Sequence, residues 1–105
     1  MSSMPLTREK AIRRLRAAER EIRALGVERL ALYGSVLRNE ARPDSDVDLL
    51  VRFAPGRKSY DRFLALSDLL EKRLGCPVEV VTTEALSPFI GPRILAEVED
   101  VLRAA

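Results

Sequence analysis

The feature that most constrains the fold is a pair of strand-like segments joined by a polar stretch. The first segment, Val27–Tyr33, ends at Gly34-Ser35, and the second, Asp46–Phe53, begins after a gap of ten residues. Because side chains alternate along a strand, the apolar residues of the second segment share one face, while Asp46 and Asp48 share the other. We therefore expect a sheet with one buried face and one face that carries carboxylates.

Apolar spacing predicts the remaining elements. A helical period, with Thr7 as N-cap and Gly26 beyond the end, marks the first helix, and Gly75 ends another. In chain order, the expected elements are helix 8–25, strand 27–33, a helical turn at 36–40, strand 46–53, helix 60–74, strand 78–82 and helix 93–102. This order predicts an α/β (α+β) fold in one domain over residues 1–105. Its small, twisted, mixed sheet would have at least three strands, with helices on one face and the other face open.

Composition excludes several kinds of chemistry. The chain has no histidine and one cysteine, so Ser-His-Asp catalysis, Cys-His catalysis, an internal disulfide and a cysteine-ligated zinc site are excluded. We expect Cys76 to be a small buried residue beside Pro77. A net charge of +2 is too small to indicate nucleic-acid binding. No segment resembles a signal peptide or a membrane span, which predicts a cytoplasmic protein without a membrane partner.

The two carboxylates indicate a cation site. Asp46 and Asp48 are expected on the same face of one strand, where they repel each other unless a cation lies between them. Mg²⁺ prefers oxygen ligands and keeps positions open for phosphate oxygens, and two such ions can clamp the attacking and leaving oxygens of a phosphoryl transfer. Glu79, on the predicted strand 78–82, is the natural third ligand because its side chain points away from the face formed by Val78 and Val80.

The Gly34-Ser35 turn supplies the features of a phosphate site. Glycine allows the backbone to approach a phosphate closely, and amides at the start of a helical turn donate to oxyanions. The Ser35 hydroxyl is suited to a β- or γ-phosphate oxygen. Arg38 and Arg42 lie in the following loop, where their guanidinium groups would meet phosphate charge. Either half of the motif alone is common, so the prediction rests on their conjunction.

Together these residues resemble a known signature. Gly34-Ser35-x10-Asp46-x-Asp48 is similar to the motif of the DNA-polymerase-β-like nucleotidyltransferases. The size and the context of the motif are similar to those of the minimal nucleotidyltransferases (MNT proteins), the antitoxins of HEPN/MNT toxin–antitoxin pairs. The resemblance implies AMP transfer from ATP, with Mg²⁺, onto a tyrosine of a HEPN ribonuclease toxin that forms a hetero-oligomer with the chain. It also implies that Gly34, Ser35 and Arg38 bind the nucleotide, and that Asp46, Asp48 and Glu79 are the catalytic metal ligands.

The chain departs from the family pattern at two positions. Many relatives have Arg-Gly in the loop where this chain has Arg38-Asn39; asparagine also tolerates a left-handed backbone, so the turn is expected to persist. Relatives commonly have Asp as the third acid, where this chain has Glu79.

Other functions remain open from the sequence. The chain would also serve as a non-catalytic antitoxin that binds its toxin, through the arginine-rich face of helix 8–25 and an apolar terminal helix containing Ile94, Leu95, Val98 and Leu102. A nucleotidyltransferase acting on a small molecule is a further alternative. The arginine-rich face is itself explained either as a solvated face stabilised by ion pairs or as a docking face for an acidic partner or its RNA.

Overall fold

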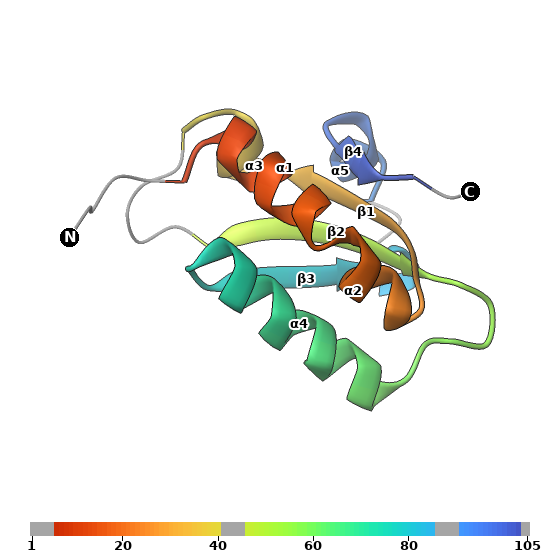
Figure 1. The fold of residues 1–105 in the computed structure, drawn as a ribbon. Helices are drawn as coiled ribbons and strands as arrows, with labels where there is room; N and C mark the ends of the chain where they lie inside the picture. Colours follow the sequence, from red (N-terminus) through yellow and green to blue (C-terminus); the bar gives the residue numbers. More distant parts are fainter. Residues whose placement is uncertain (1–5, 41–45, 86–90, 104–105) are drawn as a thin grey trace.

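The structure is a computed structural model that describes residues 6–40, 46–85 and 91–103. Within these residues, four strands and five α-helices follow one another (Figure 1). In order they are α1 (Arg8–Ala17), α2 (Glu19–Ala24), β1 (Val27–Tyr33), α3 (Gly34–Leu37), β2 (Val47–Phe53), α4 (Tyr60–Leu74), β3 (Val78–Thr82), the 3₁₀ turn η1 (Thr83–Ala85), α5 (Gly91–Ala96) and β4 (Glu99–Leu102).

The strands form one mixed sheet in the order β3-β2-β1-β4. β1 pairs antiparallel with both β2 and β4, whereas β2 and β3 are parallel. The parallel pair is possible because α4 carries the chain back along the sheet between β2 and β3 (Figure 1). The predicted α/β (α+β) fold with a small mixed sheet is therefore confirmed.

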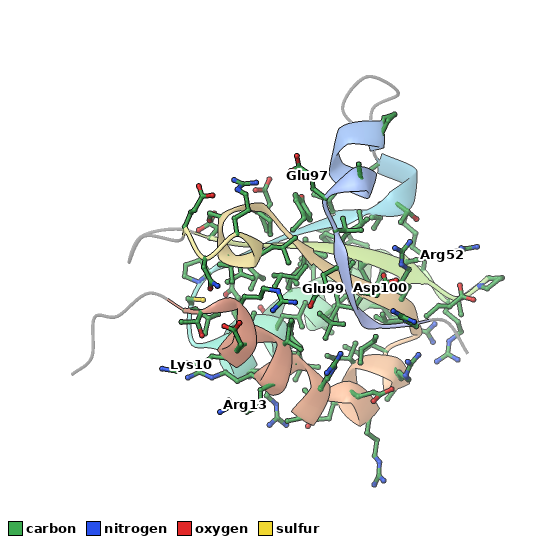
Figure 2. The ribbon with its side chains drawn as sticks, turned by 90° about the horizontal axis from the view of Figure 1, so that it is seen from above. Lys10, Arg13, Arg52, Glu97, Glu99 and Asp100 are labelled. Carbon is green, nitrogen blue, oxygen red and sulfur yellow. The ribbon has the colours of Figure 1, made fainter. Side chains whose placement is uncertain are left out.

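The core lies between the sheet and the layer formed by α1, α2 and α4, while α5 lies on the other side of the sheet (Figure 2). From the sheet, Leu30, Leu32, Leu49 and Val51 face this layer and are fully buried. The opposite face carries Tyr33 and Asp48, but also Ala31 and Leu50, which are buried. The expectation that this face is open holds only in part, because α5 lies on the same side (Figure 2). The helix-covered face and the carboxylate face are thus separated as the strand alternation predicts.

The helix ends follow local sequence signals. Thr7 accepts a hydrogen bond from the amide of Lys10 at the start of α1, and Ser59 does the same for Arg62 at the start of α4. Gly75 ends α4 in the left-handed conformation, with a φ of 75°. The expected helix 8–25 is wrong in one respect, because it breaks at Ala18 into α1 and α2.

Two other boundaries differ from the prediction. The helical turn expected at 36–40 is α3, which begins earlier, at Gly34. The helix expected over residues 93–102 is wrong: α5 ends at Ala96, and residues 99–102 form β4. This strand exists because the outer edge of β1 offers unpaired amides and carbonyls, and pairing satisfies them. Leu102 is consequently buried in the core and is not available to a partner on a terminal helix.

The structure bears on two expectations from composition, the burial of Cys76 and the lack of a membrane span. Cys76 is half-buried and packs against the hydrophobic core, and burial raises the pKa of its thiol. Among the residues described, no helix combines the length and the apolar character needed to cross a bilayer.

Candidate active site

A row of three polar side chains crosses the carboxylate face of the sheet. Tyr33 on β1 pairs in register with Asp48 on β2, and Asp48 pairs in register with Glu79 on β3. Residues directly opposite on neighbouring strands have their Cβ atoms about 4.5–5.5 Å apart. The pairing therefore brings Asp48 and Glu79 together, as the sequence predicts, and adds Tyr33 on the other side of Asp48.

Gly34 lies directly beneath the Asp48 carboxylate. A Cβ atom placed on Gly34 would lie 2.1 Å from Oδ2 of Asp48, and the φ of Gly34 is +79°. Both the contact and the left-handed backbone exclude a larger residue at this position. Glycine is thus required by the carboxylate as well as by the phosphate approach that the sequence suggests.

The surroundings of this row disfavour the ionised forms of Asp48 and Tyr33. Burial, a hydrogen bond with Glu79 and the negative charges of Glu79 and Asp46 raise the pKa of Asp48 to about 6, with Arg38 opposing the shift. Burial together with the charges of Asp48 and Glu79 raises the pKa of Tyr33 to about 12. The described residues around Asp48 therefore contribute more negative than positive charge to the site.

Asp46 lies just before β2 and is exposed. It is near enough to Asp48 for its charge to raise the pKa of that carboxyl. Within residues 6–40, 46–85 and 91–103, however, no group of three acidic or cysteine side chains converges into a ready-formed metal site. The structure thus brings Asp48 and Glu79 together and leaves Asp46 beside them.

The donor set nevertheless suits Mg²⁺. All three side chains offer hard carboxylate oxygens, the ligand class that Mg²⁺ selects. Burial first, and then Glu79 and Asp46, raise the pKa of Asp48, and a cation between the carboxylates would favour their charged forms. Asp46, Asp48 and Glu79 are therefore the residues that fit a magnesium ion.

The nucleotide-side residues occupy α3 and the turn after it. Ser35 is half-buried in α3, and its carbonyl accepts a hydrogen bond from the Glu40 amide. Arg38 is exposed, with its guanidinium 3.4 Å from a carboxylate oxygen of Glu40 and 3.6 Å from one of Glu97. Arg42, the other arginine expected to meet phosphate, lies outside the described residues.

Asn39 explains one departure from the family pattern. Its φ is +56°, so the left-handed conformation expected from the sequence is confirmed. Its side-chain oxygen also accepts a hydrogen bond of 2.9 Å from the backbone amide of Arg8, the first residue of α1. A glycine would keep the backbone but lose this link between the phosphate-side turn and α1.

Sequence reasoning missed Tyr33 as a site residue. Strand alternation carried a signal for it: the apolar Leu32 faces the helices, where it is fully buried, so the side chain of Tyr33 points to the carboxylate face. The register that places Tyr33 opposite Asp48 depends on strand pairing and is not encoded locally.

Known proteins resemble this chain in sequence and in fold. The family described as the nucleotidyltransferase domain matches residues 12–101. Protein adenylyltransferase MntA of Thermococcus cleftensis is 38% identical over 94 residues, covering 89% of this chain and 94% of that protein. A solved structure of a candidate minimal nucleotidyltransferase has a TM-score of 0.79 at 35% identity, covering 90% of this chain and 95% of its own.

A likeness of fold extends further. A chain from the complex of a tri-AMPylated Shewanella oneidensis HEPN toxin with an MNT antitoxin has a TM-score of 0.62, at 14% identity, over 89% of this chain and 73% of its own. At that identity the likeness shows the fold alone. The family match over most of the sequence carries the assignment, and the chain belongs to the nucleotidyltransferase domain family.

Proposed function

We propose that this nucleotidyltransferase transfers AMP from ATP to a tyrosine hydroxyl of a HEPN-type toxin and thereby neutralises the toxin. The observation that carries the proposal is the row in which Asp48 lies beside Glu79 and directly over Gly34. The protein-adenylyltransferase name of the Thermococcus cleftensis relative supports AMP transfer to a protein. The AMPylated toxin of the Shewanella oneidensis complex supports a HEPN-type acceptor.

In this proposal the chain's residues have separate roles. The Gly34-Ser35 turn and Arg38 bind the triphosphate, and Asp46, Asp48 and Glu79 hold Mg²⁺, with two ions at full occupancy. When bound, Mg²⁺ would neutralise phosphate charge and favour the deprotonated form of the attacking hydroxyl. The exposed position of Asp46 lets it turn toward the other two carboxylates without disturbing the buried face of β2.

The transfer is a substitution at the α-phosphorus. The tyrosine oxygen forms a bond to that phosphorus while the bond to the oxygen of the β-phosphate breaks, so pyrophosphate leaves with the electron pair. The acceptor's hydroxyl proton is released to water as the new bond forms. Arg38 opposes the negative charge that gathers on the phosphates.

The test is the mass of the acceptor. The chain is incubated with ATP, Mg²⁺ and its cognate HEPN-type partner, and the intact mass of the partner should rise by whole adenylates. Losing a residue that only hydrogen-bonds to a metal ligand typically lowers activity roughly 10–100-fold. Asp48→Asn removes a proposed ligand itself, so it should reduce the transfer rate by more than that. If the partner is inhibited but keeps its original mass, inhibition is by binding and the catalytic proposal is wrong.

A further inference from the structure

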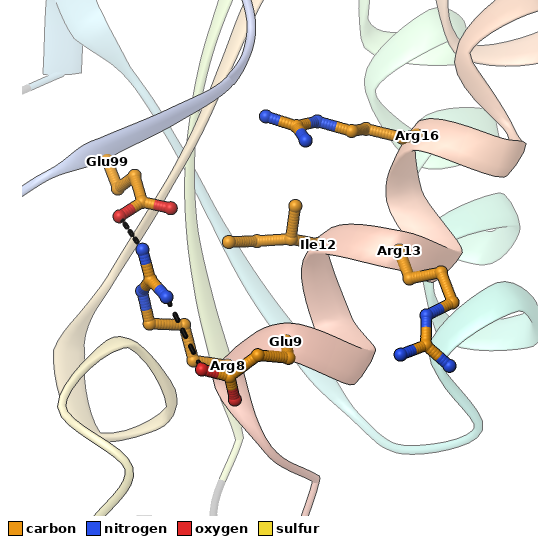
Figure 3. A pocket seen from close by; sticks show the side chains of 6 residues that line it. All are labelled: Arg8, Glu9, Ile12, Arg13, Arg16 and Glu99. Carbon is orange, nitrogen blue, oxygen red and sulfur yellow. Dashed lines mark hydrogen bonds and ion pairs between the residues drawn. The ribbon is translucent and has the colours of Figure 1, made fainter.

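A groove runs between α1 and the edge strand β4, outside the row of carboxylates. It encloses about 560 Å³, within the range of pockets that accept side chains or small ligands. Figure 3 shows it from close by. Its lining consists of Arg8, Glu9, Ile12, Arg13, Arg16 and Glu99.

The charges of this α1–β4 groove do not balance. Its two carboxylates share one cation: Arg8 forms an ion pair with Glu99, and its guanidinium also lies 3.5 Å from a carboxylate oxygen of Glu9. Arg13 and Arg16 are exposed and have no ion pair with any other described residue. The groove thus has three arginines against two glutamates, and the two unpaired arginines are free to meet an external anion.

The groove also has an apolar floor. Ile12, only 9% exposed, points from α1 toward β4, and Arg16 extends over it in the same direction (Figure 3). Arg13 lies on the outer side of the helix. A ligand that carries carboxylates beside an apolar group would match this surface better than an ion alone.

Polar contacts connect the groove to the candidate active site. The amide of Arg8 donates to Asn39, which follows Arg38 in the phosphate-side turn. Arg38 in turn pairs with Glu97, two residues before the Glu99 that lines the groove. A protein bound in the groove would therefore lie next to the nucleotide-binding residues.

We propose that the α1–β4 groove docks an acidic segment of the protein acceptor. Carboxylates of the segment pair with Arg13 and Arg16, and an apolar side chain covers Ile12. The apolar side chain of Ile12 beside the two arginines favours a protein segment over RNA, because a protein segment offers apolar side chains next to its carboxylates. The identity of the docked protein as the acceptor rests on the proposed function; the charge of the docked segment does not.

The test separates docking from chemistry in steady-state transfer to the cognate HEPN-type partner. Arg16→Glu is compared with Lys72→Glu, an equal charge change at an exposed position on α4, and with the double variant Arg13→Glu/Arg16→Glu. We expect the double variant to raise the KM for the acceptor about tenfold. Its kcat and its KM for ATP should stay at wild-type values, and Lys72→Glu should change none of them.

Salt supplies a second readout that a merely structural role would not move. Because exposed ion pairs are screened, the KM of the wild type should rise with salt toward that of the double variant, which should respond less. Thermal unfolding of each variant checks that the fold is intact. An unchanged acceptor KM in the folded double variant, or a fall in kcat alone, would overturn the proposal.

Direct binding keeps the docking proposal separate from the catalytic one. Calorimetry of Asp48→Asn with the partner, with and without Arg13→Glu/Arg16→Glu, measures docking without transfer. Weaker binding in the charge-reversed chain supports the groove even if the wild type transfers no adenylate; absence of any complex, or equal binding, overturns it. A single-stranded RNA oligonucleotide is titrated in parallel, and a loss confined to RNA binding also overturns the proposal.

Discussion

Replacing Asp48 by asparagine should stabilise the metal-free fold at neutral pH, although it removes a residue needed for the proposed transfer. Asp48 is half-buried beside Glu79 and close to Asp46, and its ionised form is disfavoured by burial and by both neighbouring charges. Asparagine occupies almost the same volume but carries no charge. The substitution therefore removes the repulsion and retains the packing over Gly34.

The pKa gives the size of the effect. A rise from 3.8 to about 6 corresponds to about 3 kcal/mol at 1.36 kcal/mol per pH unit. Because the carboxyl is only half-buried, solvent screening reduces this to about 1–2 kcal/mol. The sign follows from proton binding: the folded state holds the Asp48 proton more tightly than the unfolded chain. The free energy of unfolding therefore falls as the pH rises from about 4 to about 6.

Urea unfolding of wild type and Asp48→Asn at about pH 4 and at about pH 7.5, without divalent metal, measures this difference. The variant should be more stable by about 1–2 kcal/mol at the higher pH, equivalent to several degrees in Tm for a domain of this size, with most of that gain lost at the lower pH. Asp68→Asn, which removes an exposed carboxylate on α4, is the matched control and should show a smaller dependence on pH.

Mg²⁺ should reverse the order of stability. Binding to the folded state alone adds a stabilisation that grows with ion concentration, and the wild type should gain more of it than Asp48→Asn. If the variant is less stable than the wild type at both pH values, or if the difference is independent of pH, burial and neighbouring charge do not raise the pKa of Asp48 in the folded protein. The reasoning about the site would then be refuted.

Three further predictions address the frame of the site. Gly34→Ala should destabilise the fold by about 1–3 kcal/mol in urea unfolding, because the added Cβ clashes with Asp48 and the backbone has a left-handed φ. Gly56 has a φ of 77° and open space around it, so Gly56→Ala should show the backbone cost alone, about 1 kcal/mol. An equal loss of stability in both variants would contradict the clash. Asn39→Gly should keep the turn but lower the free energy of unfolding by about 1 kcal/mol, because it removes the hydrogen-bond acceptor for the first amide of α1. Urea unfolding measures this change, and an unchanged free energy would show that the hydrogen bond does not stabilise the fold. Absorbance titration should show Tyr33, one of the two tyrosines, ionising near pH 12, and the substitution Tyr33→Phe should abolish that ionisation step.

Local sequence signals predicted most of the fold. The strands Val27–Tyr33 and Val78–Thr82 and the helix Tyr60–Leu74 have the predicted bounds, because alternation, helical spacing and capping residues act within a few positions. β4 could not be predicted in this way. Its apolar residues also fit a helical period, and the strand forms only because β1 leaves an edge unpaired on the far side of the sheet.

For the candidate site too, the sequence predicted the residues but not their contacts. The motif identified Gly34 and Asp48 separately, but their contact depends on how α3 leaves β1 beside β2. The neighbours of Asp48 depend on register: antiparallel pairing places Tyr33 on one side, and parallel pairing places Glu79 on the other. Residue identity predicted which carboxylates are candidate metal ligands, whereas long-range strand pairing determined which of them lie side by side.

The small net charge of +2 conceals two surfaces whose charges are incomplete within the described chain. Carboxylates gather around Asp48, where burial and neighbouring negative charge raise its pKa. Arginines gather on α1, where Arg13 and Arg16 have no ion pair with the described residues. Ion pairs across the fold, such as Arg8 with Glu99, show that opposite charges are paired where the chain brings them together. Each surface can pair with an external group of opposite charge. A cation fits the first surface and an acidic protein segment fits the second, so the same physical argument connects the proposed chemistry to the proposed acceptor.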